Sequence, residues 1–254
     1  MSTLVPPCPP SVRSTLAEQL DPVLRLGVEL LDGCSPHVDV PAARARIRAG
    51  QVAYDAMRVL RSCGDLHPRF ARVLEAFEVA GLASNEERRT LMSRDLDVDD
   101  LVAGWFTGDR TPRDPLRLLS RQAAIVVGNA LLRVASARVG APSLWRSWTR
   151  AVCPCCGGAP DIVLLERGAH RSLVCARCDA QWRARRTGCL GCEADETTAI
   201  ARIGNPSLGY DLVMCNACGR FIKERPRRGL EALLVERALT AELDLAAEQR
   251  GLRI

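Results

Sequence analysis

The sequence predicts an α+β protein with three parts in order: an all-helical part, a part of short strands between cysteine pairs, and a closing helix. Apolar residues recur at helical spacing through most of residues 1–149. Residues 150–226 are instead rich in Cys and Gly and hold short β-type runs. Helical spacing returns in residues 227–254. We therefore expect an N-terminal helical domain, a cysteine-rich strand domain and a C-terminal helix within these three ranges.

Start and stop signals support the helices of the first part. Ser84 and Glu87 have the spacing of a capping box, and Asp97 is a candidate cap of the next helix. Asp114 followed by Pro115 is a good N-cap and first-turn pair. The expected helices span residues 14–31, 45–61, 69–81, 84–96, 97–106 and 114–139. We interpret two aromatic pairs, Trp105–Phe106 and Trp145/Trp148, as anchors of the core or of the junction between the parts.

Composition gives little support to a nucleic-acid partner. The 254 residues carry 35 basic and 30 acidic side chains, for a formal net charge of +5. Lys223 is the only lysine, which we interpret as a coding bias toward arginine and not as design for phosphate recognition. The basic surplus is largest in the cysteine-rich part, where thiols that ionise to bind metal would cancel much of it.

The distribution of apolar residues predicts a cytoplasmic protein without membrane insertion. The N-terminus is rich in proline and has no apolar h-region, so a secretory signal is not expected. The most hydrophobic stretch, residues 123–132, is too short to span a bilayer and predicts a buried core helix. Clustered thiols in a reducing cytosol are usually metal ligands or redox groups. Cys8, Cys34 and Cys63 stand alone, and we interpret them as packing or surface thiols.

Eight of the twelve cysteines form four CxxC turns, which we call the first to fourth knuckles. Two knuckles on facing hairpins give a tetrahedral S4 cage with metal–sulfur distances of about 2.3 Å. The 18 residues between the first two knuckles and the 22 between the last two can form two short strands and a turn. The predicted ligands are Cys153, Cys156, Cys175 and Cys178 at site 1, and Cys189, Cys192, Cys215 and Cys218 at site 2. Interleaved pairing, first with third and second with fourth, would need crossing connections and is less favoured.

The knuckles themselves indicate a repeated design. Gly157 and Gly219 follow the outer knuckles, where glycine tolerates the left-handed backbone that aims N–H groups at the sulfurs. Asp179 and Glu193 follow the inner knuckles. An S4 site suits zinc or a single rubredoxin-type iron equally well, and an iron–sulfur cluster is the less favoured third choice. The sequence therefore predicts two tandem rubredoxin-like or zinc-ribbon modules.

The ninth thiol of this part, Cys155, occupies a spacer position of the first knuckle. We expect its side chain to point away from the metal and toward solvent. Cys155 is then either a harmless substitution or a residue with a redox or partner-contacting role. Four sulfurs per site leave no open coordination position, the three histidines are scattered, and no nucleophile elbow, phosphate loop or helical HExxH occurs. These observations predict that the chain is not an enzyme.

Two other classes of function stay open at this point. A zinc-ribbon nucleic-acid-binding protein is favoured by Arg183, Arg185 and Arg186 beside Trp182, although aromatic stacking residues are sparse. A small redox enzyme that passes electrons through both centres would need a reversible redox wave and a donor.

The cysteine-rich part resembles the formate dehydrogenase accessory protein (FdhE) family. The resemblance lies in CPCCGGAP, RSLVCARCDAQWRARRTGCLGC and CNACGRFIK, and covers about residues 151–224. The family pattern outside the cysteines is matched by Pro160, Leu173, Trp182, Arg186, Phe221 and Lys223. The resemblance implies a cytoplasmic, non-enzymatic maturation factor that contacts the catalytic subunit of a molybdenum- or tungsten-dependent formate dehydrogenase. It suggests iron as the metal in preference to zinc, and it leaves Cys155, Trp182 and Arg186 as candidate redox or partner contacts.

Overall fold

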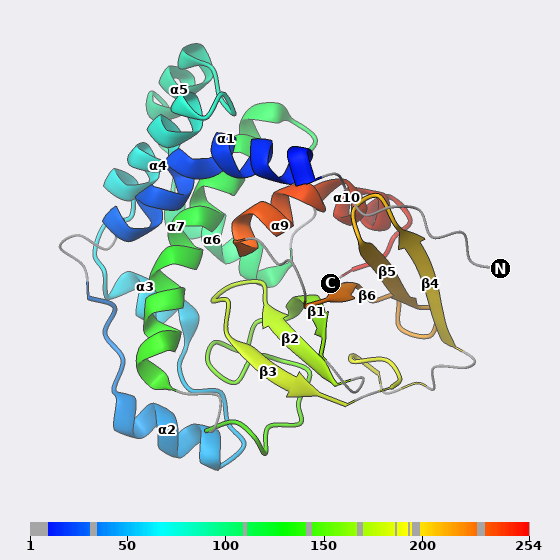
Figure 1. The fold of residues 1–254 in the computed structure, drawn as a ribbon. Coiled ribbons are helices and arrows are strands. Elements are labelled where there is room, and N and C mark those ends of the chain that lie inside the picture. Colours follow the sequence, from blue (N-terminus) through cyan, green and yellow to red (C-terminus); the bar gives the residue numbers. More distant parts are fainter. Residues whose placement is uncertain are drawn as a thin grey trace.

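Among the residues that the structure describes, helices dominate the first half of the chain, and a six-stranded sheet followed by α9 and α10 dominates the second half (Figure 1). The computed structural model describes residues 10–30, 35–108, 111–140, 144–166, 170–185, 187–192, 194, 199–227 and 232–253. Its helices are α1 (Pro10–Glu29), α2 (Val40–Arg48), α3 (Ala56–Arg61), α4 (His67–Val79), α5 (Asn85–Met92), α6 (Val98–Thr107), α7 (Pro115–Val139), α9 (Leu233–Leu239) and α10 (Ala241–Gln249). Its strands are β1 (Pro160–Leu165), β2 (Arg171–Cys175), β3 (Gln181–Ala184), β4 (Ile200–Asn205), β5 (Tyr210–Cys215) and β6 (Phe221–Pro226).

Short polar side chains begin most helices of the first part. Ser84 and Glu87 form the capping box predicted at the start of α5. Four aspartate carboxylates accept a backbone N–H from the first turn of α2, α3, α6 and α7, and these are Asp39, Asp55, Asp97 and Asp114. A cap of this kind stabilises a helix by about 1 kcal/mol. The starts predicted at Asp97 and Asp114 are therefore confirmed.

The single helix predicted over residues 45–61 is wrong. The structure has α2 ending at Arg48 and α3 beginning at Ala56. Gly50 takes a left-handed backbone conformation with φ of 72°, which ends the first helix. The backbone N–H groups of Ala53 and Tyr54 then donate hydrogen bonds to carbonyls of the first knuckle, so long-range pairing replaces the helix here.

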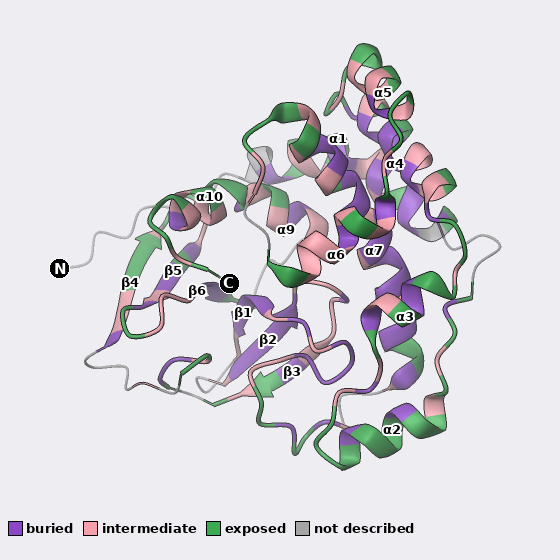
Figure 2. Ribbon diagram, turned by 180° about the vertical axis from the view of Figure 1, so that it is seen from behind, coloured by how far each residue is buried: buried purple, intermediate pink, exposed green. Residues whose placement is uncertain are grey.

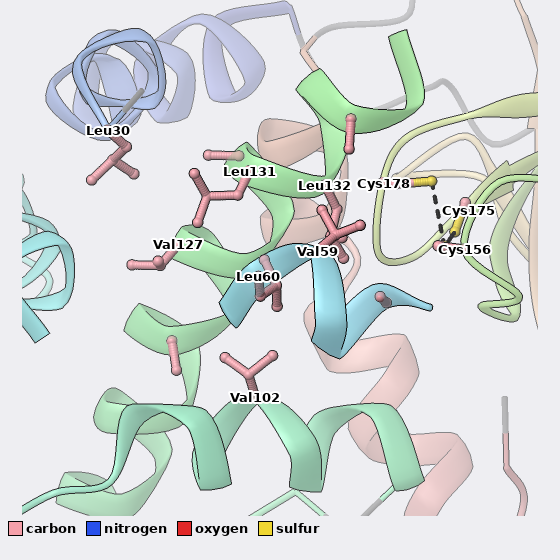
Figure 3. Close-up of a cluster of buried hydrophobic side chains, with 14 of the residues drawn as sticks. Leu30, Val59, Leu60, Val102, Val127, Leu131, Leu132, Cys156, Cys175 and Cys178 are labelled. Carbon is pink, nitrogen blue, oxygen red and sulfur yellow. Dashed lines mark hydrogen bonds between the residues drawn. The ribbon is translucent and has the colours of Figure 1, made fainter. Parts of the chain in front are cut away.

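Helix α7 is the centre of the helical part. Helices α1, α3, α4 and α6 pack around it, and its Val127 and Leu131 lie among Leu30, Leu60 and Val102 (Figure 3). Among the described helices, α7 alone is long and apolar enough to cross a bilayer. Of its most apolar 18-residue stretch, 56% is buried inside the protein. Such burial is typical of a core helix, which is what the sequence predicted for residues 123–132.

The six strands form one sheet in the order β3-β2-β1-β6-β5-β4. Neighbouring strands are antiparallel within β1–β3 and within β4–β6, and the two halves join where β1 and β6 pair in parallel, with Ile162 opposite Lys223. The short β-type runs predicted between the cysteine pairs are therefore found as strands. The two predicted ribbons thus share a sheet, because each covers an edge of the other that would otherwise be unpaired.

Over its described residues, 232–253, the C-terminal segment has two helices and not the single helix predicted. The break falls at Thr240, whose hydroxyl group donates a hydrogen bond of 2.8 Å to the carbonyl oxygen of Glu236. Leu233 and Leu243 pack on the sheet beside Ile162, and α9 also contacts α1. The segment therefore lies against both the sheet and the helical part (Figure 1).

Buried charges fix the position of α9. The Glu236 carboxylate is 0% exposed and accepts hydrogen bonds from Arg13 of α1, Arg225 of β6 and the Tyr210 hydroxyl group.

Figure 2 shows β1 and β2 buried along their length, whereas β4 at the sheet edge is largely exposed. One hydrophobic core runs from α1 through α7 into the first two knuckles, across the boundary predicted near residue 149. The three domain ranges stay a prediction.

Candidate metal centres

The structure brings the sulfurs of the first and second knuckles together at site 1. Sulfur–sulfur distances are 3.5 Å for Cys153–Cys178, Cys156–Cys175 and Cys156–Cys178, and all four sulfurs lie within 4.8 Å of one another. A tetrahedral cage with metal–sulfur distances of about 2.3 Å would place its sulfurs about 3.8 Å apart. The four side chains therefore already stand close to the geometry of a tetrathiolate site.

Backbone hydrogen bonds shape the first knuckle. The N–H of Gly157 donates to the carbonyl oxygen of Cys153 at 3.0 Å, and the N–H of Cys155 lies 3.4 Å from the Cys153 sulfur. Gly157 has a φ of 71°, and Gly219 after the fourth knuckle has a φ of 68°. Both glycines thus take the left-handed conformation that the sequence predicted for them.

The second knuckle reaches the same turn without glycine. Asp179 has a φ of 58°, an uncommon conformation for a residue with a Cβ atom. Its carboxylate accepts hydrogen bonds from the Asn129 amide at 3.1 Å and from the Arg237 guanidinium at 2.7 Å. These two partners, one on α7 and one on α9, hold the strained turn in place and thereby connect the knuckle to both helices.

Site 1 lies inside the main hydrophobic core. Its four cysteines are at most 5% exposed, and Figure 3 shows three of them beside the part of the core that holds Val59 of α3 and Leu132 of α7. The ring of Tyr54 belongs to the same cluster, and burial together with the neighbouring thiolates raises the pKa of its hydroxyl group well above the ordinary value. A metal at this site would be shielded from solvent and would cross-link the helical part to the sheet.

Site 2 repeats this arrangement at the surface. The distances are 3.6 Å for Cys189–Cys218 and for Cys192–Cys215, and these four sulfurs also lie within 4.8 Å of one another. Cys192 is exposed and Cys218 is half-buried, whereas Cys189 and Cys215 are buried. The two sites therefore share a geometry and differ in solvent access.

Thiolates are the form that binds metal. Burial raises the pKa of Cys153 and Cys178 at site 1 and of Cys218 at site 2, whereas the pKa of one other thiol at each site is lowered. Hydrogen bonds from the thiols of Cys153, Cys175 and Cys178 lower the pKa of Cys156 well below the ordinary value. At site 2 burial raises the pKa of Cys189, but the backbone N–H groups of Cys192 and Gly191 outweigh it and bring that pKa down to about 7. A bound cation would stabilise the remaining thiolates in the same way. The donor sets fit a tetrahedral ion that prefers sulfur, either zinc or iron.

The candidate contact residues outside the eight ligands lie in different places. Cys155 is 0% exposed, so the expectation that its side chain faces solvent is wrong; its carbonyl oxygen accepts a hydrogen bond from the N–H of Tyr54. Trp182 is 2% exposed and donates to the Arg150 carbonyl oxygen, which argues against a direct partner contact. Arg186 lies outside the described residues.

Of the three isolated cysteines of the helical part, Cys63 lies in the part of the chain that the structure describes. Cys63 is disulfide-bonded, which corrects its interpretation as a free thiol. Cys8 and Cys34 lie outside the described residues.

Several residues that support site 1 were missed by sequence reasoning. Arg177 in the second knuckle stacks its guanidinium 4.3 Å from the Phe106 ring and donates to the Phe106 carbonyl oxygen at 2.5 Å. Trp145 donates to the Gln181 carbonyl oxygen at 2.9 Å. The aromatic residues were predicted as junction anchors, which is the role these contacts give Phe106 and Trp145. The residues that contact Phe106 and Trp145 could not be predicted, because they are distant in the sequence and no local motif links them to the aromatic residues.

The fold and the sites define a class of protein: a helical part joined to one mixed sheet that carries two four-cysteine clusters. A solved structure with a similar fold is the FdhE protein from Pseudomonas aeruginosa, which matches with a TM-score of 0.59 and 16% sequence identity over 94% of this chain and 93% of that chain. The chain therefore has an FdhE-like fold, as the resemblance of its cysteine motifs predicted. Neither the protein-family models nor the curated protein sequences gave a match.

Proposed function

We propose that this protein is an accessory factor that assists the maturation of a formate dehydrogenase catalytic subunit. The observation that carries the proposal is the coincidence of two independent features. The FdhE-like fold extends over 94% of the chain, and the same cysteines that match the family motifs converge in two clusters. The neighbour's name thus agrees with the motif resemblance, although at 16% identity its structure supports the fold alone.

The sites support a role in binding and not in catalysis. Four sulfurs at each site complete a tetrahedral coordination and leave no position for a substrate or an activated water. Such centres stabilise a fold or change oxidation state. We propose that all eight cysteines are metal ligands and that the metal is iron, on the strength of the family resemblance, with zinc as the alternative.

The surface position of site 2 suggests how partner binding could respond to the metal. The exposed Cys192 allows a partner to approach the metal closely, and a change between ferric and ferrous iron would alter the local charge by one unit. Anaerobic purification followed by metal analysis and optical spectra tests this redox version. Stoichiometric zinc without iron would exclude it.

Nothing in the described residues favours nucleic acid over a protein partner. Trp182, the aromatic residue beside the arginine cluster, is buried and cannot stack on a base. We expect binding to random DNA or RNA to be negligible at physiological salt.

Deletion of the gene in its native host tests the proposed function. Formate dehydrogenase activity should fall sharply while the catalytic subunit is still synthesised. The gene of this protein should restore the activity, and so should the gene of the Pseudomonas aeruginosa FdhE protein. Unchanged formate dehydrogenase activity in the deletion strain would overturn the proposal.

A further inference from the structure

A cavity of about 580 Å³ lies beside site 1, at the meeting point of α1, α7, α9 and the second knuckle. Cavities of roughly 300–1,000 Å³ are the size that binds a ligand or a few side chains of a partner. Cys178 and the residues that follow it form part of the wall. An occupant would therefore touch the segment that carries two of the site 1 sulfurs.

Apolar side chains form most of this wall. They come from three helices and include Leu24 of α1, Ile125 and Val126 of α7, and Leu233 and Leu234 of α9, all half-buried. Half-buried apolar residues that surround a hollow lose solvent contact when a second apolar group enters. The wall therefore favours an apolar occupant.

Most polar groups in the wall already have partners. Ser136 donates to the Cys178 carbonyl oxygen at 3.1 Å, and the Asn129 amide donates to the Arg177 carbonyl oxygen at the same distance. Arg237 forms ion pairs with Asp161 and Asp179. Because these groups are already hydrogen-bonded or ion-paired, they offer little to a ligand.

Arg133 on α7 is the exception. Its side chain is exposed and forms no hydrogen bond or ion pair with any part of the chain that the structure describes. A Cβ atom placed on Gly27 of α1 would come within 3.3 Å of the Arg133 Nη2 atom, so the guanidinium lies across the gap between the two helices. A lone guanidinium at the rim of an apolar cavity is complementary to a carboxylate attached to an apolar group.

We propose that this cavity seats an apolar side chain of a partner polypeptide and that Arg133 pairs with an Asp or Glu carboxylate of the same segment. The proposal deepens the proposed function and rests on it in one respect, the choice of a polypeptide over a small molecule as the occupant. Contact with the second knuckle would place the bound segment directly against the wall of site 1.

Selection of displayed random peptides against the purified full-length, metal-loaded chain tests the proposal without any formate dehydrogenase. Enriched peptides should carry a large apolar residue next to an acidic one. Their affinity should fall about tenfold or more in Arg133→Glu, because an attractive charge pair becomes a repulsive one. It should be largely kept in Arg133→Lys.

Two further variants separate the cavity from general surface effects. Ala137 is exposed at the rim, so Ala137→Trp should block the cavity without disturbing the core, and it should abolish binding. Arg94→Glu makes the same charge change on an exposed residue after α5 that does not line the cavity, and it should bind normally. No enriched peptide, or peptides that bind Ala137→Trp unchanged, would overturn the proposal. So would tight binding of decanoate in their place, which would make the cavity a fatty-acid site. A failure of the proposed function would be seen independently, as unchanged formate dehydrogenase activity in the gene-deletion strain.

Discussion

The backbone N–H of Tyr54 donates a 3.1 Å hydrogen bond to the carbonyl oxygen of Cys155, and the N–H of Ala53 donates one of 2.9 Å to the carbonyl oxygen of Pro154. The helical part thus holds the first knuckle by its main chain, before any side chain or metal is considered. This contact explains why Cys155 is buried although it stands between two ligands in the sequence. It also explains why site 1 belongs to the main core, whereas site 2 lies at the surface.

Replacement of Cys155 by Ser should leave both metals bound. The Cys155 side chain lies outside the four-sulfur cluster, and its position is fixed by backbone bonds that serine can also make. A buried hydroxyl group in place of a thiol should cost about 1–2 kcal/mol of unfolding free energy. Metal analysis and chemical denaturation of the purified variant measure both quantities. Cys156→Ser is the matched control and should lose the site 1 metal; loss of a metal from Cys155→Ser would mean that the ligand set is different.

The two sites should release metal at different rates. Cys192 is exposed and Cys218 half-buried, so a chelator can attack site 2 directly, whereas the sulfurs of site 1 become accessible only when the core opens. Mixing the protein with excess chelator should give a fast and a slow phase of equal amplitude. Cys192→Ser should lack the fast phase and keep the slow one. A single phase, or a fast phase that survives in this variant, would contradict the assigned difference between the sites.

Arg237→Met should destabilise the protein strongly. Arg237 pairs with Asp161 of β1 and Asp179 of the second knuckle, and its removal would leave both largely buried carboxylates without their cation. Breaking a buried pair in this way costs about 3–5 kcal/mol. Arg72→Met removes an exposed pair with Glu29 and should cost less than about 1 kcal/mol. Urea unfolding of both variants gives the comparison, and equal losses would show that Arg237 does not clamp α9 to the knuckle.

The cysteine clusters and the strands could be predicted from sequence because their signals are local. A CxxC turn followed by glycine specifies a knuckle by itself, and 18 or 22 residues between knuckles leave room for one hairpin. The capping box at Ser84 and the cap at Asp114 are equally local and are found at the predicted places. All of these features depend on residues a few positions apart.

The features that sequence reasoning missed depend on distant partners. Residues 51–55 have helical neighbours on both sides, and their pairing with the first knuckle lies about a hundred residues away along the chain. The cap signal at Asp55, which accepts from the Arg58 N–H, could have revealed the break. The parallel pairing of β1 with β6, the burial of Cys155 and the partners of Arg237 follow from the packed fold and have no local signal.

Affinity purification of the tagged protein from a lysate of its native host, under anaerobic conditions, tests the central claim most directly. Mass spectrometry of the eluate should identify a formate dehydrogenase catalytic subunit in an amount comparable with the tagged protein. The Arg94→Glu variant should recover the same amount, because Arg94 lies outside the proposed contact surface. Recovery of nucleic acid or ribosomes in place of that subunit would contradict the claim that this protein is a formate dehydrogenase accessory factor.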